Sequence, residues 1–240
     1  MWSPDDGVTR VLIVTAHPDD VDFGSAGTVA AFTDAGLEVT YCIVTNGDAG
    51  GSDRAMSRSD MAELRQKEQR AAAAEVGVTD VRFLGHADGM VQASIALRRD
   101  ISRVIRQVKP GRVVTQSPER RWDFIFASHP DHLAAGEAAV CAVYPDARNP
   151  FAHPELLNDE GLEPWTVNEL WIMSGTDPNV VVDTTATIDR KVAALLRHES
   201  QIDDPAGITE RVTMGARAAA ATAGLPEGSA AELFRITRIP

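Results

Sequence analysis

Apolar residues gather in short runs along the chain, and these runs predict the strands of a buried sheet. The first run, residues 11–16, has no polar alternation, which is typical of a strand covered on both faces in a parallel sheet. Five further apolar runs follow it. The six predicted strands cover residues 11–16, 38–45, 80–84, 112–115, 169–173 and 180–183.

Helical patterns fill the segments between these runs. Residues 97–108 show the clearest one, a single apolar stripe that ends before Pro110 and Gly111. Other helices are predicted from about 24 to 35, from Ser57 or Asp60 to about 75, from 132 to about 144 and from 187 to 198. The alternation of strands and helices predicts a doubly wound α/β fold with a mostly parallel sheet and right-handed crossovers.

Two segments lack such periodicity. Residues 49–59 contain Gly50, Gly51, Ser52 and Asp53 and predict a loop, and residues 145–164 contain several prolines and predict an excursion on the surface. A chain of 240 residues is long enough for one large α/β domain. We expect one domain over 1–240, with a core over about 9–201 and a helical tail over 202–240.

Composition narrows the class of protein. Hydrophobic residues make up 44% and charged residues 24%, which are ordinary globular values, and the apolar runs are too short to span a bilayer. A net charge of −12 opposes binding to a phosphate backbone. The amino terminus lacks the pattern of a secretory signal, and Cys42 and Cys141 are too few and too far apart for a disulfide framework. We therefore expect a cytoplasmic enzyme with neither a nucleic-acid nor a membrane partner.

The first predicted strand ends in His17, Pro18, Asp19 and Asp20, three of which have side chains able to bind a metal. Pro18 has no backbone N–H and cannot continue a strand ladder, so the chain must turn at this point. Open α/β sheets bind ligands in the crevice beyond the carboxyl ends of their strands. The motif therefore lies where a ligand site is expected, although spacing alone leaves open whether Asp19 or Asp20 faces a metal.

A second cluster, His129-Pro130-Asp131-His132, uses the same residue types far downstream. A single histidine beside an aspartate is usually a structural pair, but two such clusters after apolar strands indicate one shared site. Gly24 and Gly27 do not have the spacing of a dinucleotide-binding loop, which argues against a nucleotide site.

These two clusters resemble the signatures of the PIG-L/LmbE-like de-N-acetylases, zinc hydrolases that remove acetyl groups from N-acetylated amino sugars. The resemblance spans about residues 9–201 and is carried by residues 16–20, 45–47, Arg65 with Glu68, 83–89, 129–132, Asp183, Lys191 and 198–201. It implies a Rossmann-like (LmbE-like) fold with three layers, α/β/α.

The resemblance also implies roles for the residues of both clusters. Two imidazoles and one carboxylate leave an open position on a tetrahedral zinc, the pattern of a catalytic site. The metal ligands would be His17, Asp20 and His132, with Zn²⁺ expected and another divalent metal such as Fe²⁺ as the alternative. Asp19 would act as general base, and His129 would protonate the leaving amine. Asp131 is expected to accept a hydrogen bond from His129 and so to raise the pKa of His129.

Three further residues are expected to bind the substrate, namely Asn46, Arg65 and Asp88. For Arg65, the resemblance places the guanidinium against the substrate, held by Glu68, whereas helix spacing alone allows a simple Arg65–Glu68 ion pair. The sugar-thiol branch of the family has a tyrosine where this chain has Ala127, which weakens an assignment to that branch.

Together these features predict a zinc-dependent hydrolase that removes an acetyl group from an N-acetylglucosamine-type unit of a small metabolite or glycoside. One alternative is a metal-dependent hydrolase of another amide or ester, since the same ligands would activate water against many carbonyls. A second alternative is a non-catalytic carbohydrate-binding protein with the same fold. The sequence leaves a homo-oligomer open.

Overall fold

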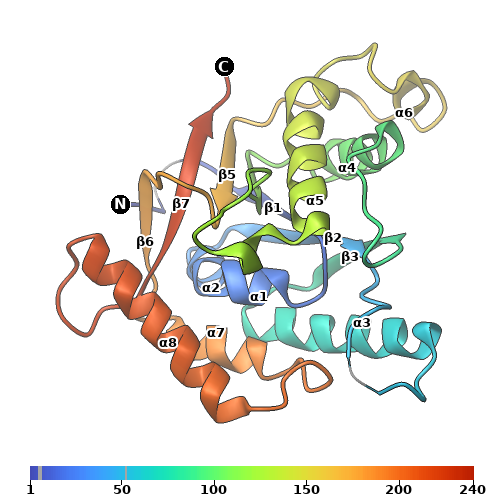
Figure 1. Cartoon of the computed structure of the whole chain (residues 1–240). Helices are drawn as coiled ribbons and strands as arrows, with labels where there is room; N and C mark the ends of the chain where they lie inside the picture. The colour runs from blue at the N-terminus through green and yellow to red at the C-terminus, as the bar shows by residue number, and fades with distance from the viewer. Residues whose placement is uncertain (5–6, 52) are drawn as a thin grey trace.

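A computed structural model describes residues 1–4, 7–51 and 53–240, so Asp5, Asp6 and the predicted loop residue Ser52 lie outside the described residues. A seven-stranded sheet stands at its centre with helices on both sides (Figure 1). The strands are β1 Arg10–Thr15, β2 Glu38–Thr45, β3 Asp80–His86, β4 Arg112–Gln116, β5 Glu169–Met173, β6 Val180–Asp183 and β7 Ala231–Arg238, in the spatial order β3-β2-β1-β4-β5-β7-β6.

The predicted mostly parallel sheet is confirmed. Strands β3, β2, β1, β4 and β5 are parallel neighbours, and all six sequence-predicted strands are present. Strand β1 lies inside the sheet between β2 and β4, and its residues 11–14 are completely buried. Because the strands are parallel, the carboxyl ends of β1, β4 and β5 meet at one edge of the sheet.

Strand β7 corrects the prediction for the end of the chain. We expected a helical tail over 202–240, and helix α8 (Pro205–Thr222) agrees with it, but residues 231–238 form a strand. This strand lies between β5 and β6 and pairs antiparallel with both. Its partners come much earlier in the chain, so a local pattern does not reveal the pairing.

The helices form the two outer layers. The other helices are α1 Asp20–Gly24, α2 Ala26–Asp34, α3 Arg58–Glu75, α4 Ile95–Val108, α5 Pro130–Cys141, α6 Pro154–Asn158 and α7 Ile188–Leu195, with a 3-10 helix at Ile125–Ser128 and a π-helical turn at Ala142–Asp146. Val11 and Ile13 pack with α2, α3 and α7, whereas Leu12 and Val14 pack with α4 and α5 on the opposite face. Successive strand residues point to opposite faces, so β1 joins both cores and the predicted three-layer fold is confirmed.

Local signals fix where two of these helices begin. The Ser57 hydroxyl accepts a hydrogen bond from Asp60 N at 3.1 Å, and the Ser94 hydroxyl accepts one from Leu97 N at 3.2 Å, each in the N-cap position. The predicted start of α3 near Ser57 is thereby confirmed. None of the helices in the described part of the chain combines the length and apolar character needed to cross a bilayer.

Candidate metal centre and active site

The first motif forms a tight turn between β1 and α1. Asp19 has a φ of 91°, an unusual value for a residue with a side chain, and it precedes the first turn of α1. Two hydrogen bonds hold this turn: Asp19 N donates to the Gln69 side chain at 2.7 Å, and His17 N donates to Asp20 Oδ2 at 2.6 Å. The carboxylates of Asp19 and Asp20 are thus fixed at the carboxyl end of β1 and project from successive positions of one rigid turn.

The second motif begins helix α5. His129 is the N-cap and Pro130 takes the first helical position, where a missing N–H costs no hydrogen bond. This places Asp131 and His132 in the first turn of α5, where they meet the residues at the end of β1. Although His17 and His132 are 115 positions apart, His17 Nδ1 lies 3.2 Å from His132 Nε2.

The three residues predicted as metal ligands converge on one point. His132 Nε2 lies 3.0 Å from Asp20 Oδ1, and His17 Nδ1 lies 3.4 Å from Asp20 Oδ2. A tetrahedron whose metal–ligand bonds are about 2.0–2.1 Å long has edges of about 3.3 Å. The three distances are close to those edges, with Oδ1 of Asp20 facing His132 and Oδ2 facing His17, so the spacing of this donor set is compatible with a zinc-sized cation.

Charge at this point also favours a cation. Burial by itself would lower the pKa of His17, but hydrogen bonds to Asp20 and Asp88 raise it to about 11. Burial would raise the pKa of Asp20, but the charge of His132 and its hydrogen bond hold that pKa well below its usual range. The carboxylates therefore create a strongly negative site, and a positive charge placed there, a proton or a metal ion, is stabilised.

The other nitrogen of His17 faces two more carboxylates. His17 Nε2 lies 3.1 Å from Asp131 Oδ2 and 3.2 Å from Asp88 Oδ1. Backbone N–H groups of Gly89 and Val91 donate to Asp131 at 2.7 and 3.1 Å, which fixes this carboxylate in place. A carboxylate that accepts from one ring nitrogen of a histidine orients the other toward a metal. Here that other nitrogen is Nδ1, which faces Asp20 and His132.

This arrangement corrects the predicted role of Asp131. Its carboxylate contacts His17 and not the side chain of His129, whose Nδ1 instead accepts a hydrogen bond from Asp131 N at 3.2 Å. The pKa of His129 is lowered, because it is partly buried and lies near His17 and His132, so the expected rise is wrong. The N-cap geometry explains the error: it turns Nδ1 toward the backbone of α5 and away from the Asp131 carboxylate.

His129 nevertheless lies close to the other two histidines. Its ring centroid is 5.0 Å from that of His17 and 5.3 Å from that of His132, and ligand nitrogens of all three rings come within 4.8 Å of one another. The side chains therefore offer a second possible ligand set, with His129 in place of Asp20.

Arg65 connects the two sides of the site. Its Nη2 donates to Pro18 O at 2.7 Å and to Asp19 Oδ2 at 3.0 Å. Its Nη1 donates to Gly47 O at 3.1 Å and lies 3.5 Å from Asp88 Oδ2. The guanidinium therefore fixes the turn that carries Asp19 and links it to Asp88.

The predicted contact between Arg65 and Glu68, common to both sequence interpretations, is wrong. Glu68 accepts hydrogen bonds from the backbone and the hydroxyl of Ser200, each at 2.7 Å, while the guanidinium of Arg65 points to the turn. A Cβ atom added at Gly50 would clash with Arg65 Nη1, so the backbone of the 49–51 loop approaches the guanidinium closely. Arg65 is only 4% exposed, and it is among the residues that line the site cavity.

The pKa of Asp19 is raised to about 6. Burial is the main cause, the nearby Arg65 guanidinium opposes it, and Asp20 adds to it. A carboxylate with a pKa near neutrality is suited to accept and release a proton in catalysis.

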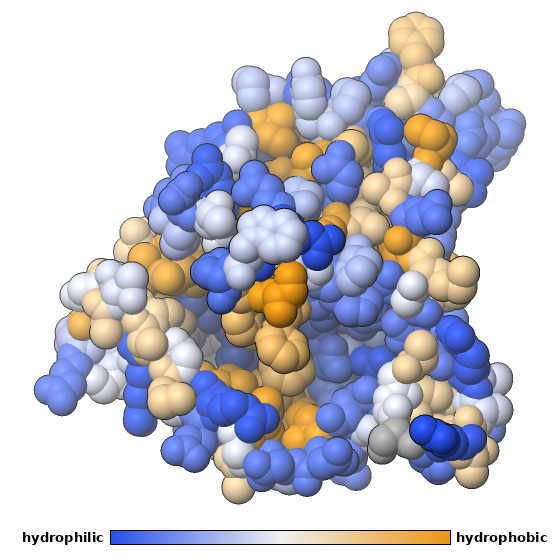
Figure 2. Space-filling model, in the orientation of Figure 1, coloured by the Kyte–Doolittle hydropathy of each residue, from blue (hydrophilic) through white to orange (hydrophobic). Residues whose placement is uncertain are grey.

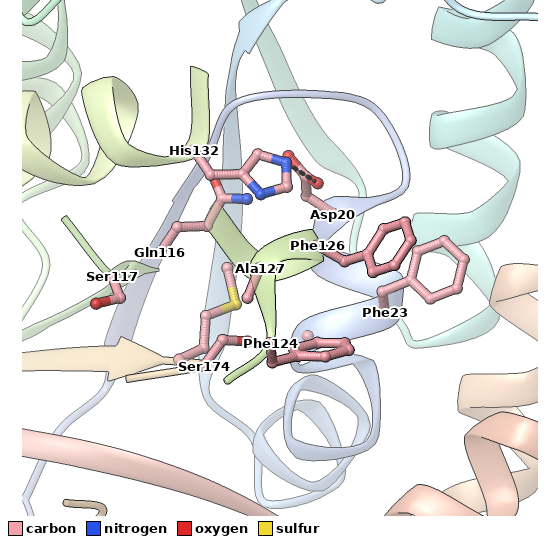
Figure 3. Close-up of a pocket in the computed structure, with 11 residues that line it drawn as sticks. Asp20, Phe23, Gln116, Ser117, Phe124, Phe126, Ala127, His132 and Ser174 are labelled. Atoms are coloured by element: carbon pink, nitrogen blue, oxygen red, sulfur yellow. Dashed lines mark ion pairs between the residues drawn. The ribbon is translucent and has the colours of Figure 1, made fainter. Parts of the chain in front are cut away.

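Two hollows meet at the convergence point. A polar one of about 390 Å³ is lined by His17, Asp19, Ala49, Gly50, Arg65, Asp88 and His129, and an apolar one of about 460 Å³ is lined by Gly24, Gln116, Ser117, Phe124, Ala127, Met173 and Ser174. Asp20, Phe23, Phe126 and His132 line both. Figure 2 shows the molecule hollowed on this face, and Figure 3 shows the apolar hollow with the Asp20–His132 ion pair beside it.

Two of the three predicted substrate-binding residues line a hollow of the site, and the third does not. Arg65 and Asp88 line the polar hollow, but both oxygens of Asp88 contact protein groups, namely His17 through Oδ1 and Arg65 and Ala49 N through Oδ2. Asn46 is not among the described residues that line either hollow. The structure thus brings Arg65 and Asp88 into the site, whereas Asn46 lies outside the lining of both hollows.

Comparison with known protein families identifies the chain. A family model named PIG-L and described as GlcNAc-PI de-N-acetylase matches residues 12–143. The chain belongs to the PIG-L family. The sequence prediction of this family is confirmed, and so is the predicted enzyme class, a de-N-acetylase.

Relatives of this PIG-L protein include enzymes from archaea and bacteria. It is 31% identical to a diacetylchitobiose deacetylase of Thermococcus kodakarensis over 201 residues, which cover 84% of this chain and 73% of the relative. It is 32% identical to a probable N-acetyl-alpha-D-glucosaminyl L-malate deacetylase 2 of Bacillus cereus over 201 residues, 81% of this chain and 84% of the relative. The structure of N,N'-diacetylchitobiose deacetylase from Pyrococcus horikoshii with its inhibitor MPG matches with a TM-score of 0.89 at 29% identity and covers 98% of this chain and 86% of that one.

Several residues that shape the site of this PIG-L protein were not predicted from the sequence. Gln116 and Met173 end β4 and β5, and the Gln116 side chain accepts a hydrogen bond from Ala16 N at 2.9 Å. The rule that ligands bind beyond the carboxyl ends of parallel strands could have found both. Phe23 was missed because α1 is too short to show a helical period.

A buried layer beneath the site holds α1 in place. Asp22 Oδ2 is 2.8 Å from both Gln69 Nε2 and His198 Nε2, and the Lys191 ammonium donates to Phe23 O at 2.8 Å. Lys191 and His198 belong to the part of the sequence that carries the family resemblance. In the structure they support the helix that continues from the first motif.

Proposed function

We propose that the protein is a zinc-dependent de-N-acetylase that hydrolyses the acetamide of an N-acetylglucosamine-type unit in a small metabolite or glycoside. The observation that carries the proposal is the convergence of His17, Asp20 and His132 at distances that fit a tetrahedral cation, with Asp19 and His129 lining the polar hollow beside them. Relatives that cover most of the chain are named deacetylases of diacetylchitobiose and of an N-acetylglucosaminyl malate.

The metal would be held by His17 Nδ1, a carboxylate oxygen of Asp20 and His132 Nε2. Zinc bound there would polarise the acetamide carbonyl and lower the pKa of the attacking water to about 7. Asp131 and Asp88 accept from His17 Nε2 and so keep Nδ1 turned toward the metal. His132 is oriented in the same way by a hydrogen bond to the backbone of Ala127.

Asp19 would act as general base. Its carboxylate borders the polar hollow, its pKa is raised to about 6, and Arg65 holds one of its oxygens at 3.0 Å. The water gives a proton to Asp19 as its oxygen forms a bond to the acetyl carbon. Because Arg65 also holds the backbone of the turn, the base keeps a fixed position relative to Asp20.

His129 would act as general acid. Its Nδ1 accepts a hydrogen bond from Asp131 N, so Nε2 is the nitrogen that can donate a proton toward the hollow. The lowered pKa makes an imidazolium at this position a stronger acid. When the carbon–nitrogen bond breaks, the amine nitrogen takes this proton, and acetate and the free amino sugar are released.

The surroundings of the reaction complete the proposal. We expect a small-molecule substrate and a cytoplasmic location. A nucleic-acid or membrane partner is not expected, because the net charge is −12 and the apolar runs are short.

Acetate release from a panel of N-acetyl amino sugars, measured together with the zinc content of the purified protein, tests this function. We expect release from N-acetylglucosamine-type compounds by the zinc-loaded protein and a loss of turnover with full zinc content in Asp19→Asn. Hydrolysis of simple esters or other amides without hydrolysis of any N-acetyl sugar would point to the alternative hydrolase. Sugar binding with bound zinc and no turnover would point to a binding protein.

A further inference from the structure

The apolar hollow is much larger than the methyl group of an acetyl requires. Its volume of about 460 Å³ lies in the range of sites that hold whole small ligands, roughly 300–1,000 Å³. Phe23, Phe124, Phe126, Ala127 and Met173 supply its apolar lining, and the Asp20–His132 pair lies at its border with the metal centre (Figure 3). A chain of several carbon atoms next to the reacting carbonyl would fit its size.

Most of the surface of the hollow is apolar, and among the described residues its polar side chains outside the metal centre are Gln116, Ser117 and Ser174. Among the described residues that line it, the charged side chains are Asp20 and His132, which both belong to the metal centre. The side-chain oxygen of Gln116 already accepts a hydrogen bond from Ala16 N. The polar hollow, in contrast, is lined by the ionisable side chains of His17, Asp19, Arg65, Asp88 and His129, a surface better matched to a hydroxyl-rich sugar than to an alkyl chain. The two hollows are therefore chemically different sides of one site.

Apolar surface in the hollow is also open to solvent. Phe126 is 82% exposed and Phe124 is 53% exposed, and both rings line the hollow. Covering such surface with an aliphatic chain removes it from water, which stabilises the complex in proportion to the area buried.

The geometry of an amide decides which part of a substrate enters the hollow. The carbonyl carbon carries the amine nitrogen on one side and the acyl chain on the other, so the two substituents point apart. With the sugar in the polar hollow and the carbonyl at the metal centre, the acyl chain points into the apolar hollow. Resting on the function proposed above, we infer that this hollow is an acyl-chain subsite and that the enzyme hydrolyses N-acyl amino sugars whose acyl group is longer than acetyl.

The reaction itself is unchanged. Water adds its oxygen to the acyl carbon, the carbon–nitrogen bond breaks, and the amine takes the proton. The products are a fatty acid of medium length and the free amino sugar. Only the chain that follows the reacting carbon differs.

A chain-length series on glucosamine tests the inference. The full, zinc-loaded protein is assayed for release of the free amine from N-acetyl-, N-butyryl-, N-hexanoyl- and N-octanoylglucosamine. We expect kcat/KM to rise roughly fourfold for each added methylene until the hollow is filled. A flat or falling series with an active acetyl compound would overturn the inference and leave the proposed function intact.

Failure of the proposed function is recognised separately. If none of the four compounds is hydrolysed, that function is wrong, and binding of the same compounds to the zinc-loaded protein then decides the subsite. A Kd that falls with chain length supports it, and a constant Kd overturns it. A parallel series with an N-acetyl group and methyl or octyl at the anomeric carbon tests the other orientation. A gain found only in that series would assign the hollow to the aglycone and overturn the inference.

Substitutions in the lining test whether the preference for longer acyl chains arises in the apolar hollow. Phe124→Ala should reduce the ratio of kcat/KM for octanoyl to that for acetyl by about tenfold, because an aromatic wall of the hollow is lost. The matched control is Ile125→Ala, since Ile125 is 51% exposed and borders neither hollow, and the ratio should stay unchanged. Ala127→Leu should fill the hollow and move the best substrate to a shorter chain. Equal ratios in Phe124→Ala, Ala127→Leu and the control would contradict the subsite.

Discussion

The guanidinium of Arg65 lies 3.0 Å from the carboxylate of Asp19, and it also donates to Pro18 O at 2.7 Å. A helix residue thus holds both the side chain and the backbone of the turn at the end of β1. This matters because Asp19 has a φ of 91°, a conformation that costs of order 1–3 kcal/mol for a residue with a side chain. The hydrogen bonds from Arg65 help to hold the turn in this form.

The first prediction concerns this contact. Arg65→Lys keeps a positive charge but loses the fork that joins Pro18 to Asp19, so we expect kcat to fall roughly 10- to 100-fold while zinc stays bound. Steady-state kinetics and metal analysis check the result. Arg70→Lys on the same helix is the control, since Arg70 donates to Val81 O at 2.7 Å, away from the site. Near-native kcat in Arg65→Lys would show that the fork is dispensable.

The second prediction decides between the two possible ligand sets. His17→Ala and His132→Ala should both lose bound zinc, because each removes one of three protein ligands. His129→Ala should keep full zinc content, because Asp20 completes the ligand set. It should lose turnover, because the proposed general acid is gone. Metal content after gel filtration separates these outcomes. Loss of zinc in His129→Ala with retention in Asp20→Ala would assign the site to the three histidines.

The third prediction tests the corrected role of Asp131. Asp131→Asn weakens the interaction with His17 Nε2, so zinc affinity should fall roughly 10- to 100-fold. Competition with a chromophoric chelator measures that affinity. Asp123→Asn serves as control, because Asp123 is an exposed aspartate that pairs with Arg121 outside the metal centre. If Asp131→Asn changes only the rate of amine release and leaves zinc affinity unchanged, the carboxylate acts through His129, as the sequence first suggested.

The sequence predicts the fold well where the signal is local. The run that becomes β1 is continuous and apolar, and it ends in proline, so both the buried strand and the turn at His17 follow from it. The same holds for α3, whose start is marked by the side chain of Ser57. Strand β7 was not predicted, because it is defined by pairing with β5 and β6 and no local period carries that information.

In the candidate site, too, the features with a local signal could be predicted and the tertiary contacts could not. The residue types His17, Asp19, Asp20, His129 and His132 could be read from two motifs, and the structure brings them together. Which group each carboxylate or guanidinium contacts depends on distant backbone. Arg65 has Glu68 one helical turn away, yet it donates to carbonyls of two loops, and Asp131 accepts from the 89–91 loop. Such contacts depend on tertiary structure, so residue spacing alone points to the wrong partner.

The last prediction concerns the buried pair of His198 and Asp22 beneath α1, whose side chains are both fully buried and 2.8 Å apart. Burial by itself would lower the pKa of His198, but the hydrogen bond and charge of Asp22 raise it above 6.5. A group whose pKa is raised on folding stabilises the protein fully below its unfolded pKa, and this contribution is lost as the pH rises through the folded value. His198→Gln, which keeps a hydrogen-bonding amide without the charge, should therefore lower the free energy of unfolding by roughly 1–2 kcal/mol at about pH 6 and by less at about pH 9. Urea unfolding at saturating zinc measures both values. In an Asp22→Asn background the larger loss at about pH 6 should disappear, because Asp22 no longer raises the pKa of His198 against the effect of burial. A larger loss at the higher pH would show that His198 is buried in its neutral form.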